Sequence, residues 1–366
     1  MSTTKSPPEQ APAGSPGEER AENLPQQPPP GGSPSPTTAN PAQWTAAPLD
    51  ADDAEEDPGL ADLASSTASL NSSVMQYRTV QGRTYHSSRG NAEYWGSNDE
   101  KQLESMDLAH HSQTLVLGGK LFLAPLKDDI QKVVDIGTGT GLWAIDFADA
   151  YPNCEVIGTD LSPIQPSWVP PNLKFEIDDC TQPWTFEADS IDFVHIRYLT
   201  GSIQDWPSLF KEAYRCIKPG GYIESFEAEP WILSDDASVP ENGALARWGP
   251  LFVEGGKILG RTFTMSSDGT QRKGIEDAGF VDLHETDYKV PLGRWARDPN
   301  MKEIGACTAA SILQDVEGYV LYMADLQGWK KEEVAVYAAQ LRQELRNPAI
   351  HGYCKMKLIY ARKPEA

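Results

Sequence analysis

Three glycines with regular spacing mark the part of the sequence where chemistry is expected. The run Val133-Val-Asp-Ile-Gly-Thr-Gly-Thr-Gly-Leu142 places them at positions 137, 139 and 141, between an apolar stretch and a helical one. Glycine accepts positive φ and lets the backbone approach a ligand closely. A dinucleotide fingerprint has its third glycine three positions after the second, where this chain has Leu142. The spacing therefore disfavours a nicotinamide-dependent oxidoreductase.

Acidic residues accompany three successive predicted strands. Asp135 lies inside the strand before the glycines, Asp160 ends the next strand and Asp179 follows the third. In an open α/β sheet, the carboxyl ends of strands at the switch point form the ligand crevice. There Asp160 can accept from both hydroxyls of a ribose, and Asp179 can accept from the amino group of an adenine. The three acids predict a site for an adenosyl ligand that carries an amino group and no phosphate.

Two residues after the acids are candidate catalytic residues. His195 and Arg197 share one face of the fourth predicted strand, because side chains alternate along a strand. Arg197 lies nearer the crevice, where it either binds a ligand carboxylate or forms a surface ion pair. His195 is either a general base or a hydrogen-bonded core histidine.

Aromatic and polar residues outside the crevice are candidates for a substrate wall or a lid, although clustered aromatics also suit a plain core. His110 and His111 are adjacent on a predicted helix and point about 100° apart, so shared metal binding is disfavoured and no metal is expected. The substrate and lid candidates are Tyr85, Tyr94, His111, Glu227 and Trp231.

Alternating elements must position these residues. Short apolar runs alternate with helical stretches from Val133 onward, which indicates βαβ units and a parallel sheet. We predict strands over 132–136, 155–159, 173–177, 191–196 and 221–227, with helices over 143–150 and 206–217. Pro219-Gly220-Gly221 is expected to break the second helix. Later in the chain, 281–290 and 353–362 are predicted to be two strands that pair with each other, and 330–346 is predicted to be a helix.

A helix is also expected before the sheet. Ser97-Asn-Asp-Glu100 has the spacing of a capping box, which predicts the start of that helix. Apolar and small residues follow at helical intervals at Leu103, Met106, His110, Thr114 and Leu117.

The first 73 residues differ in composition from the rest. They hold 13 of the 29 prolines of the 366-residue chain, and Trp44 is their only aromatic residue. Such a stretch cannot bury enough apolar surface to order itself. We predict a disordered Pro-rich and acidic tail over 1–73 and one folded domain over 74–366. A solvated spacer is favoured for the tail over a segment that docks a specific partner.

The charge of the chain indicates which binding partners to expect, and its cysteines indicate the cellular compartment. The net charge is −22, of which the tail contributes −9, and no basic stripe is present, so direct binding to nucleic acid or to anionic membranes is not expected. No run approaches the roughly 20 apolar residues of a membrane span. Five scattered cysteines without a CxxC pair indicate a reducing compartment. No Lys/Arg-rich nuclear localisation signal is visible, since Lys330-Lys331 is the largest basic pair of its region. A cytoplasmic location is therefore favoured, and a nuclear location is left open.

Several motifs resemble those of the class I S-adenosylmethionine-dependent methyltransferases. They are Asp135-Ile-Gly-Thr-Gly-Thr-Gly141, Thr159-Asp160-Leu161, the step at Asp179 and Lys218-Pro-Gly-Gly221. Other stretches resemble the fungal LaeA-like methyltransferases of secondary metabolism, over roughly residues 74–363. These include Gly82-Arg-Thr-Tyr-His86, Asn98-Asp-Glu100, Leu161-Ser-Pro-Ile-Gln-Pro166 and His195-Ile-Arg197.

The resemblance implies a fold and a cofactor. The fold is a doubly wound, Rossmann-like α/β structure with a seven-stranded, mostly parallel sheet whose last strand is antiparallel. A helical N-terminal cap (74–131) precedes a cofactor-binding core (132–230), and a substrate cap (231–366) carries a helical insertion before the last strand. The cofactor is S-adenosyl-L-methionine, held by Asp135, Gly137, Thr138, Gly139, Gly141, Asp160, Leu161, Asp179 and Cys180.

Two functions are compatible with the resemblance. The first is an enzyme that methylates an oxygen, nitrogen or carbon atom of a small biosynthetic intermediate. The second is a nuclear regulator of secondary metabolism that acts through protein partners. The sequence leaves the methyl acceptor undefined, because fold and cofactor site do not determine what the substrate cap admits.

Overall fold

The structure is a computed structural model that describes residues 77–87 and 93–365. The predicted tail over 1–73 and the start of the folded domain at Val74 lie outside these residues, so the predicted domain boundaries stay predictions.

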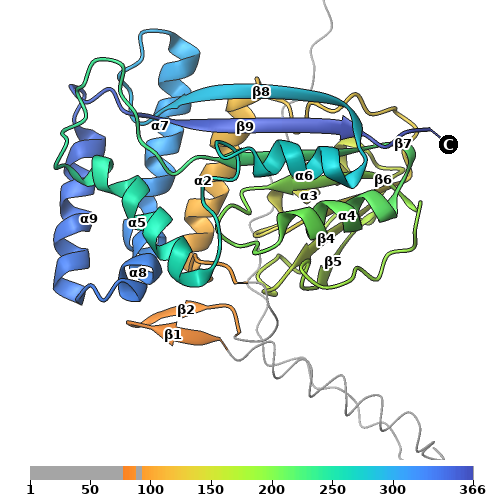
Figure 1. Ribbon diagram of the computed structural model, residues 1–366, viewed down its shortest axis with the longest axis horizontal. Helices are drawn as coiled ribbons and strands as arrows, with labels where there is room; N and C mark the ends of the chain where they lie inside the picture. The colour runs from red at the N-terminus through yellow and green to blue at the C-terminus, as the bar shows by residue number, and fades with distance from the viewer. Residues whose placement is uncertain (1–76, 88–92, 366) are drawn as a thin grey trace, which may run out of the picture. The chain divides into compact units, whose positions relative to one another are not determined.

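Seven strands form one sheet in the order β5-β4-β3-β6-β7-β9-β8 (Figure 1). The first five run parallel to one another, and β9 is antiparallel to both of its neighbours, β7 and β8. The predicted strands, the predicted pairing of the last two and the antiparallel last strand are thus confirmed. The bounds are Lys132–Ile136 (β3), Glu155–Asp160 (β4), Leu173–Ile177 (β5), Ile191–Arg197 (β6), Ile217–Ala228 (β7), Val281–Pro291 (β8) and Tyr353–Arg362 (β9).

Strand β7 begins earlier than predicted. Helix α4 (Trp206–Cys216) ends at Cys216, and Ile217 already pairs with Ile191 of β6. The register then shifts, and pairing resumes at Tyr222. The Pro-Gly-Gly run therefore lies in an irregularity of the strand, where Gly220 has a φ of +82°, rather than between helix and strand.

Helices cover both faces of the sheet because successive side chains of its strands alternate. Val134 packs in the cluster that contains α4 and α6 (Thr270–Ala278), whereas Val133 packs in the cluster that contains α3 (Leu142–Ala150). Asp135, two residues after Val133, shares the face of α3. The predicted helix over 143–150 is confirmed as α3, which starts one residue earlier.

A second core lies among the C-terminal helices. It unites α5 (Ala244–Leu259), α8 (Val316–Leu326) and α9 (Lys331–Arg346) with Tyr85 and Trp95. Gly243 offers no side chain to cap α5, and Glu344 of α9 accepts from the backbone N–H groups of Ala244 and Leu245 at 2.8 Å instead. The helix predicted over 330–346 is confirmed as α9.

Helix α2 (Glu100–Val116) packs against α7 (Pro299–Gln314). Its N-cap is Asp99, whose side chain accepts from the Gln102 N–H, so the predicted capping box at Ser97 is wrong. Ser97 Oγ instead accepts from Arg83 at 2.8 Å. The buried side chains of α2 are polar: Gln102, Ser105, Ser112 and Gln113.

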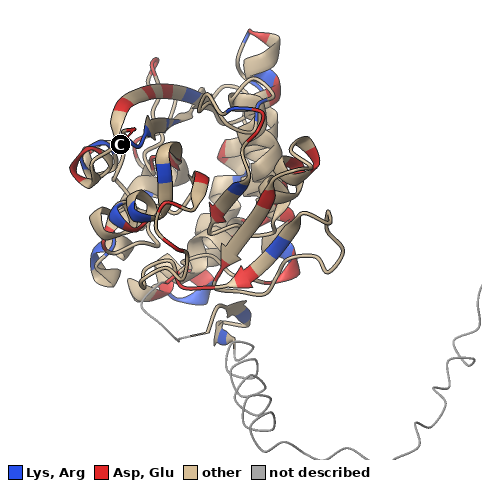
Figure 2. Cartoon of the chain, turned by 90° about the vertical axis from the view of Figure 1, so that its right-hand side faces the viewer, with Lys and Arg blue, Asp and Glu red and all other residues tan. Residues whose placement is uncertain are grey.

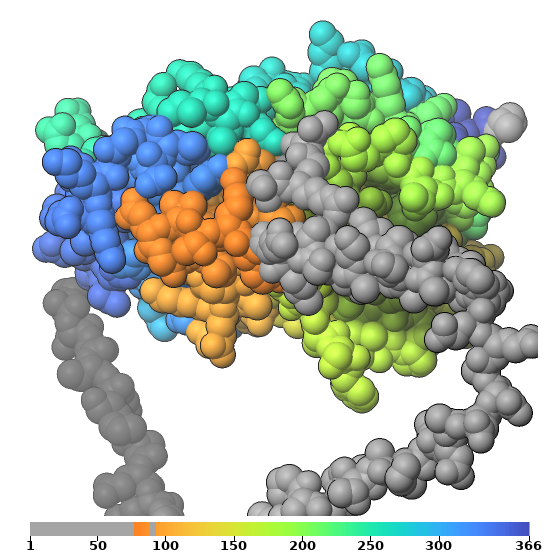
Figure 3. All heavy atoms as spheres, turned by 90° about the horizontal axis from the view of Figure 1, so that it is seen from below, coloured from red at the N-terminus to blue at the C-terminus, as the bar shows by residue number. Residues whose placement is uncertain are grey.

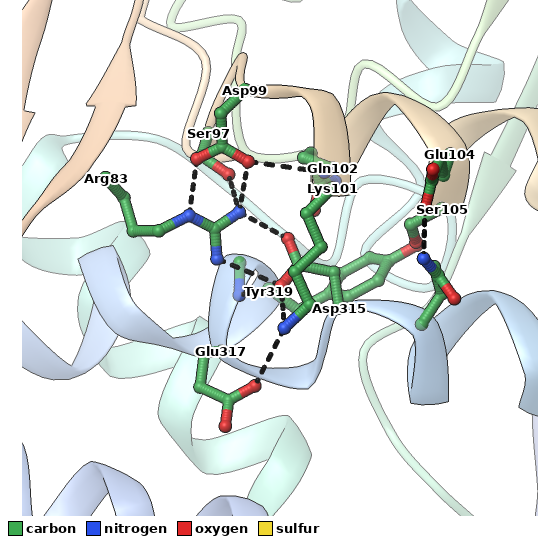
Figure 4. Close-up of polar contacts among 12 residues, drawn as sticks. Arg83, Ser97, Asp99, Lys101, Gln102, Glu104, Ser105, Asp315, Glu317 and Tyr319 are labelled. Atoms are coloured by element: carbon green, nitrogen blue, oxygen red, sulfur yellow. Dashed lines mark hydrogen bonds and ion pairs between the residues drawn. The ribbon is translucent and has the colours of Figure 1, made fainter.

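A short hairpin of β1 (Arg78–Val80) and β2 (Arg83–Tyr85) is tied to this helical part by one arginine. Arg83 donates to both carboxylate oxygens of Asp99 and to Asp315, the fully buried N-cap of α8 (Figure 4). The hairpin accordingly lies beside the C-terminal helices in the space-filling view (Figure 3). Acidic and basic residues intermix on the face shown in Figure 2.

Candidate active site

A cavity of about 140 Å³ opens at the carboxyl ends of the parallel strands. Gly137 and Gly139 form its floor, Asp160 ends β4 beside them, and Arg197 ends β6 opposite. Its remaining wall comes from the N-terminal segment, α2 and α8. Its position matches the crevice that the strand pattern predicts.

Asp160 fixes the glycine turn to the end of β4. One carboxylate oxygen accepts from the Gly139 N–H at 2.8 Å, and the other accepts from the Ser162 N–H at 3.0 Å. Burial raises the pKa of Asp160 to about 6, although the backbone N–H groups of Ser162, Gly139 and Leu161 lower it. At Gly139 φ is +59°, and a Cβ would lie 2.5 Å from Met106 Cε, so the turn approaches α2 closely.

Asp135 links the same turn to β6. One oxygen accepts from Thr138 Oγ1 at 2.6 Å, and the other lies 2.7 Å from His195 Nδ1. Burial lowers the pKa of His195, so the ring is neutral and donates from Nδ1 to the carboxylate. The ring also stacks on Trp143 with centroids 3.7 Å apart. His195 is 1% exposed and outside the cavity lining, which supports the core interpretation over the general base.

Arg197 presents a half-buried cation to the cavity. It donates to His110 Nδ1 at 2.9 Å, and His110 Nε2 donates to Asp146 at 3.0 Å. Burial lowers the pKa of Arg197 to about 10, which leaves it charged at neutral pH. Among the described residues, His110 is its only hydrogen-bond partner. Its remaining donors suit an anionic group of a ligand.

The other predicted cofactor and lid residues divide into those that line the cavity and those that do not. The cavity lining includes Asp135, Gly137, Thr138, Gly139, Asp160, Leu161, Cys180, Arg197 and Tyr94. Gly141 and Asp179 are outside it. Asp179 accepts from the backbone and hydroxyl of Thr181, and its neighbour Asp178 lines the cavity instead.

Four predicted substrate or lid residues lie elsewhere. Tyr85 is fully buried in the helical core beside Tyr322, and His111 is exposed. Glu227 is fully buried and accepts from the backbone N–H groups of Leu199 and Thr200. Trp231 is 38% exposed and packs over Gly249.

Several cavity residues were not predicted, and most come from helices. They are Asn98, Gln102, Met106, Ala109, Gln113, Tyr198 and Tyr319, among others. Polar and small residues three or four apart along α2, from Gln102 to Gln113, were the available signal for one wall. No local signal marks Tyr319, which reaches the cavity from a helix more than 200 residues later.

The parallel sheet, the glycine turn and the acid at the end of the next strand define a class I S-adenosylmethionine-dependent methyltransferase. The comparisons with known proteins agree, since a family model described as a methyltransferase domain matches residues 108–284.

Fungal relatives narrow the assignment. Methyltransferase pytC of Aspergillus terreus is 37% identical over 305 residues, covering 83% of this chain and 93% of its own. Secondary metabolism regulator LAE1 of Cochliobolus heterostrophus is 34% identical over 295 residues, covering 78% and 94%. Protein-methionine methyltransferase laeA of Emericella nidulans is 30% identical over 299 residues, covering 81% and 79%. The chain belongs to this fungal family of LaeA-like methyltransferases.

Two absences concern the described part of the chain only. Between residues 77 and 365, the segment 88–92 aside, no helix has the length and apolar character to cross a bilayer. The same residues contain no cluster of three or more His, Cys, Asp or Glu side chains able to bind a metal ion.

Proposed function

We propose that the chain transfers a methyl group from S-adenosylmethionine to an oxygen, nitrogen or carbon atom of a small intermediate of fungal secondary metabolism. The observation that carries the proposal is that Asp160, Arg197 and the backbone of the glycine turn line one cavity. The Asp160 carboxylate can accept from sugar hydroxyls, and the Arg197 guanidinium can bind the carboxylate of an amino acid. The pair therefore suits a ligand that joins an adenosine to an amino acid.

The residues around the cavity fit each part of this cofactor. Both Asp160 oxygens accept backbone N–H groups, and the carboxylate has acceptor capacity left for a ribose hydroxyl. Leu161 and Cys180 offer apolar surface to the adenine, with Asp178 beside them as an acceptor for its amino group. The free donors of Arg197 suit the methionine carboxylate. Asn98 Oδ1 is buried without a partner among the described residues and suits the amino group.

Positioning supplies most of the catalysis in this proposal. When bound, S-adenosylmethionine supplies an electrophilic methyl carbon on a positively charged sulfur. Transfer would form one bond from the acceptor atom to that carbon and break the carbon–sulfur bond, with the electron pair left on sulfur, and an acceptor that carries a proton would release it to solvent. Asp160 and Arg197 hold the two ends, and Asp135 keeps the turn in place through Thr138. No protein base is required for an acceptor that is already neutral and nucleophilic.

A second candidate function is regulation through protein partners. It is supported by the similarity to LAE1 and laeA, whose names describe a secondary metabolism regulator and a protein-methionine methyltransferase. The higher identity of pytC favours the enzyme. Capture of partners from a fungal lysate with the full chain, but not with a chain lacking residues 1–73, would favour the regulator.

The cofactor site is tested by replacing Asp160. Asp160→Ala is expected to weaken S-adenosylmethionine binding by at least 100-fold in calorimetry, because two charge-assisted hydrogen bonds of about 1.5–3 kcal/mol each are lost. Asp149→Ala, which removes an exposed acid of α3, is the matched control and should bind like the wild type.

The pH dependence gives a second arm of this test. Since the pKa of Asp160 is raised to about 6, wild-type affinity should fall as the pH drops below 6, while Asp160→Asn should show no such fall. Equal affinity of the wild type and Asp160→Ala would exclude the ribose role.

A further inference from the structure

A second cavity, of about 70 Å³, adjoins the first at α2. Its walls are mostly apolar and mostly buried, and they come from the ends of β7, β8 and β9 and from α2, α5, α7 and α8. Ala228, Trp248, Val290 and Met356 are among them. Apolar walls of this kind bind apolar ligands by excluding water.

The two cavities share one wall, formed by Ala109, Gln113, Tyr198 and Tyr319. Tyr319 is held in place by the hydroxyls of Ser105 and Ser311 at 3.2 and 3.3 Å (Figure 4 shows its approach to α2). A ligand in either cavity therefore touches the same four side chains.

Two residues of this shared wall have hydrogen-bonding groups that the described protein does not use. Gln113 is 7% exposed, and its side chain makes no hydrogen bond within the described residues. The Tyr198 hydroxyl likewise has no such partner there. Tyr198 also has a φ of +60°, a conformation that costs energy for a bulky residue and is found mostly where function requires it. Burial raises the pKa of Tyr198, so its hydroxyl remains a donor.

Glu229 is a buried acidic residue that lines the second cavity and not the first. Glu229 is 8% exposed, and its Oε2 accepts from Ser267 Oγ at 2.7 Å. Its Oε1 is buried with no hydrogen-bond partner among the described residues. A carboxylate oxygen without a partner in an apolar wall is unfavourable unless a ligand supplies a donor. Burial raises the pKa of Glu229, and a bound cation would lower it again.

We propose that the second cavity is the methyl-acceptor site and that it selects a compact, largely apolar molecule bearing an amino group, which Glu229 binds. The acceptor atom lies at the shared wall, between Gln113 and Tyr198, and the amino group lies at the opposite end of the molecule. The inference rests on the proposed function, because it places the methyl donor in the first cavity.

Charge and polarity disfavour two other ligand classes. A carboxylate or phosphate ligand would bring a like charge to Glu229 in a site with little water, which is strongly unfavourable. A large polar ligand would leave its polar groups facing Ala228, Val290 and Met356. An ammonium or amine donor satisfies Oε1, and an aromatic or aliphatic body satisfies the walls.

The test uses the full-length chain saturated with S-adenosylhomocysteine and three probes of similar size. They are 2-phenylethylamine, 2-phenylethanol and phenylacetate, which match to within one non-hydrogen atom, and their binding is measured by calorimetry and by quenching of tryptophan fluorescence. The amine should bind at least tenfold more tightly than the alcohol, and the acid should bind most weakly. Glu229→Gln should weaken amine binding at least tenfold while leaving the alcohol unchanged, and Glu241→Gln, an exposed acid, should change neither.

Two further measurements keep the outcomes separate. Ile312→Trp, which narrows the second cavity, should block the amine and keep cofactor affinity. If S-adenosylmethionine fails to bind the wild type, the proposed function is wrong. If it binds normally but the amine shows no preference over the acid, or Glu229→Gln binds the amine like the wild type, the acceptor inference is wrong. Methylation of a methionine peptide that is unaffected by Glu229→Gln would also overturn it.

Discussion

Asp135 is a buried side chain that connects two elements, the glycine turn and strand β6. Its two oxygens bind different partners, Thr138 in the glycine turn and His195 in the neighbouring strand. A buried carboxylate is tolerated only when such hydrogen bonds compensate its lost hydration. Because burial lowers the pKa of His195, the pair is a carboxylate with a neutral donor. Of the two hypotheses for His195, a general base and a hydrogen-bonded core histidine, this arrangement supports the second.

At the residue scale we predict that His195→Ala destabilises the fold. The variant leaves Asp135 without a donor and removes the ring stacked on Trp143, so the free energy of unfolding should fall by about 2–4 kcal/mol. Urea denaturation followed by tryptophan fluorescence measures the change. A variant as stable as the wild type would contradict this structural role and would favour the general base again.

The glycine turn at the start of α3 leaves no room for a side chain at Gly141. Gly141, the N-cap of α3, has a φ of +83°, and a Cβ there would lie 2.4 Å from Cζ of Phe175 in β5. Gly269, the N-cap of α6, has the same φ of +83°, yet a Cβ there would meet nothing within 4 Å. The two positions therefore differ in packing and not in backbone strain.

At the element scale this contrast gives a prediction. Gly269→Ala should lower the free energy of unfolding by about 1 kcal/mol, which is the cost of a left-handed conformation for a residue with a Cβ. Gly141→Ala should lose that amount and a further 1–3 kcal/mol for overpacking against Phe175. Paired urea titrations of the two variants measure the difference, and equal losses would show that β5 moves aside freely.

Buried carboxyl groups characterise the molecule as a whole. Burial raises the pKa of Glu224 to about 7 and that of Glu227 to about 8. Both accept backbone N–H groups that close loops onto β7: Glu224 from Leu123 and Ala124, and Glu227 from Leu199 and Thr200. In the unfolded chain these acids titrate near their ordinary values, so the folded state binds protons more tightly.

At the scale of the molecule we predict that stability falls as the pH rises from 7 to 8.5. A raised carboxyl pKa gives stability that is complete below the unfolded pKa and is lost as the pH passes the folded pKa. The loss is at most about 1.4 kcal/mol per pH unit for each proton. Urea midpoints at constant ionic strength measure it, and Glu227→Gln should flatten the slope. A midpoint that rises over this range would contradict the prediction.

Much of the sheet was predictable because its signals are local. Apolar runs of five to seven residues, the glycines that follow the first run and the acid that ends β4 each lie within a short stretch of chain. Boundaries failed where pairing between strands overrides local propensity, as at Ile217, which joins β7 ahead of the Pro-Gly-Gly run.

The sequence by itself determined the parallel sheet, the turn above it and the placement of Asp160 beside that turn, because neighbouring residues set strand ends. Only the tertiary structure decided which side chains enclose the cavities. Ser105 meets Ser311 across more than 200 residues, and Glu229 rather than Glu227 lines the second cavity. Those contacts depend on how α2, α7 and α8 pack together, and packing over such separations leaves no local pattern in the chain.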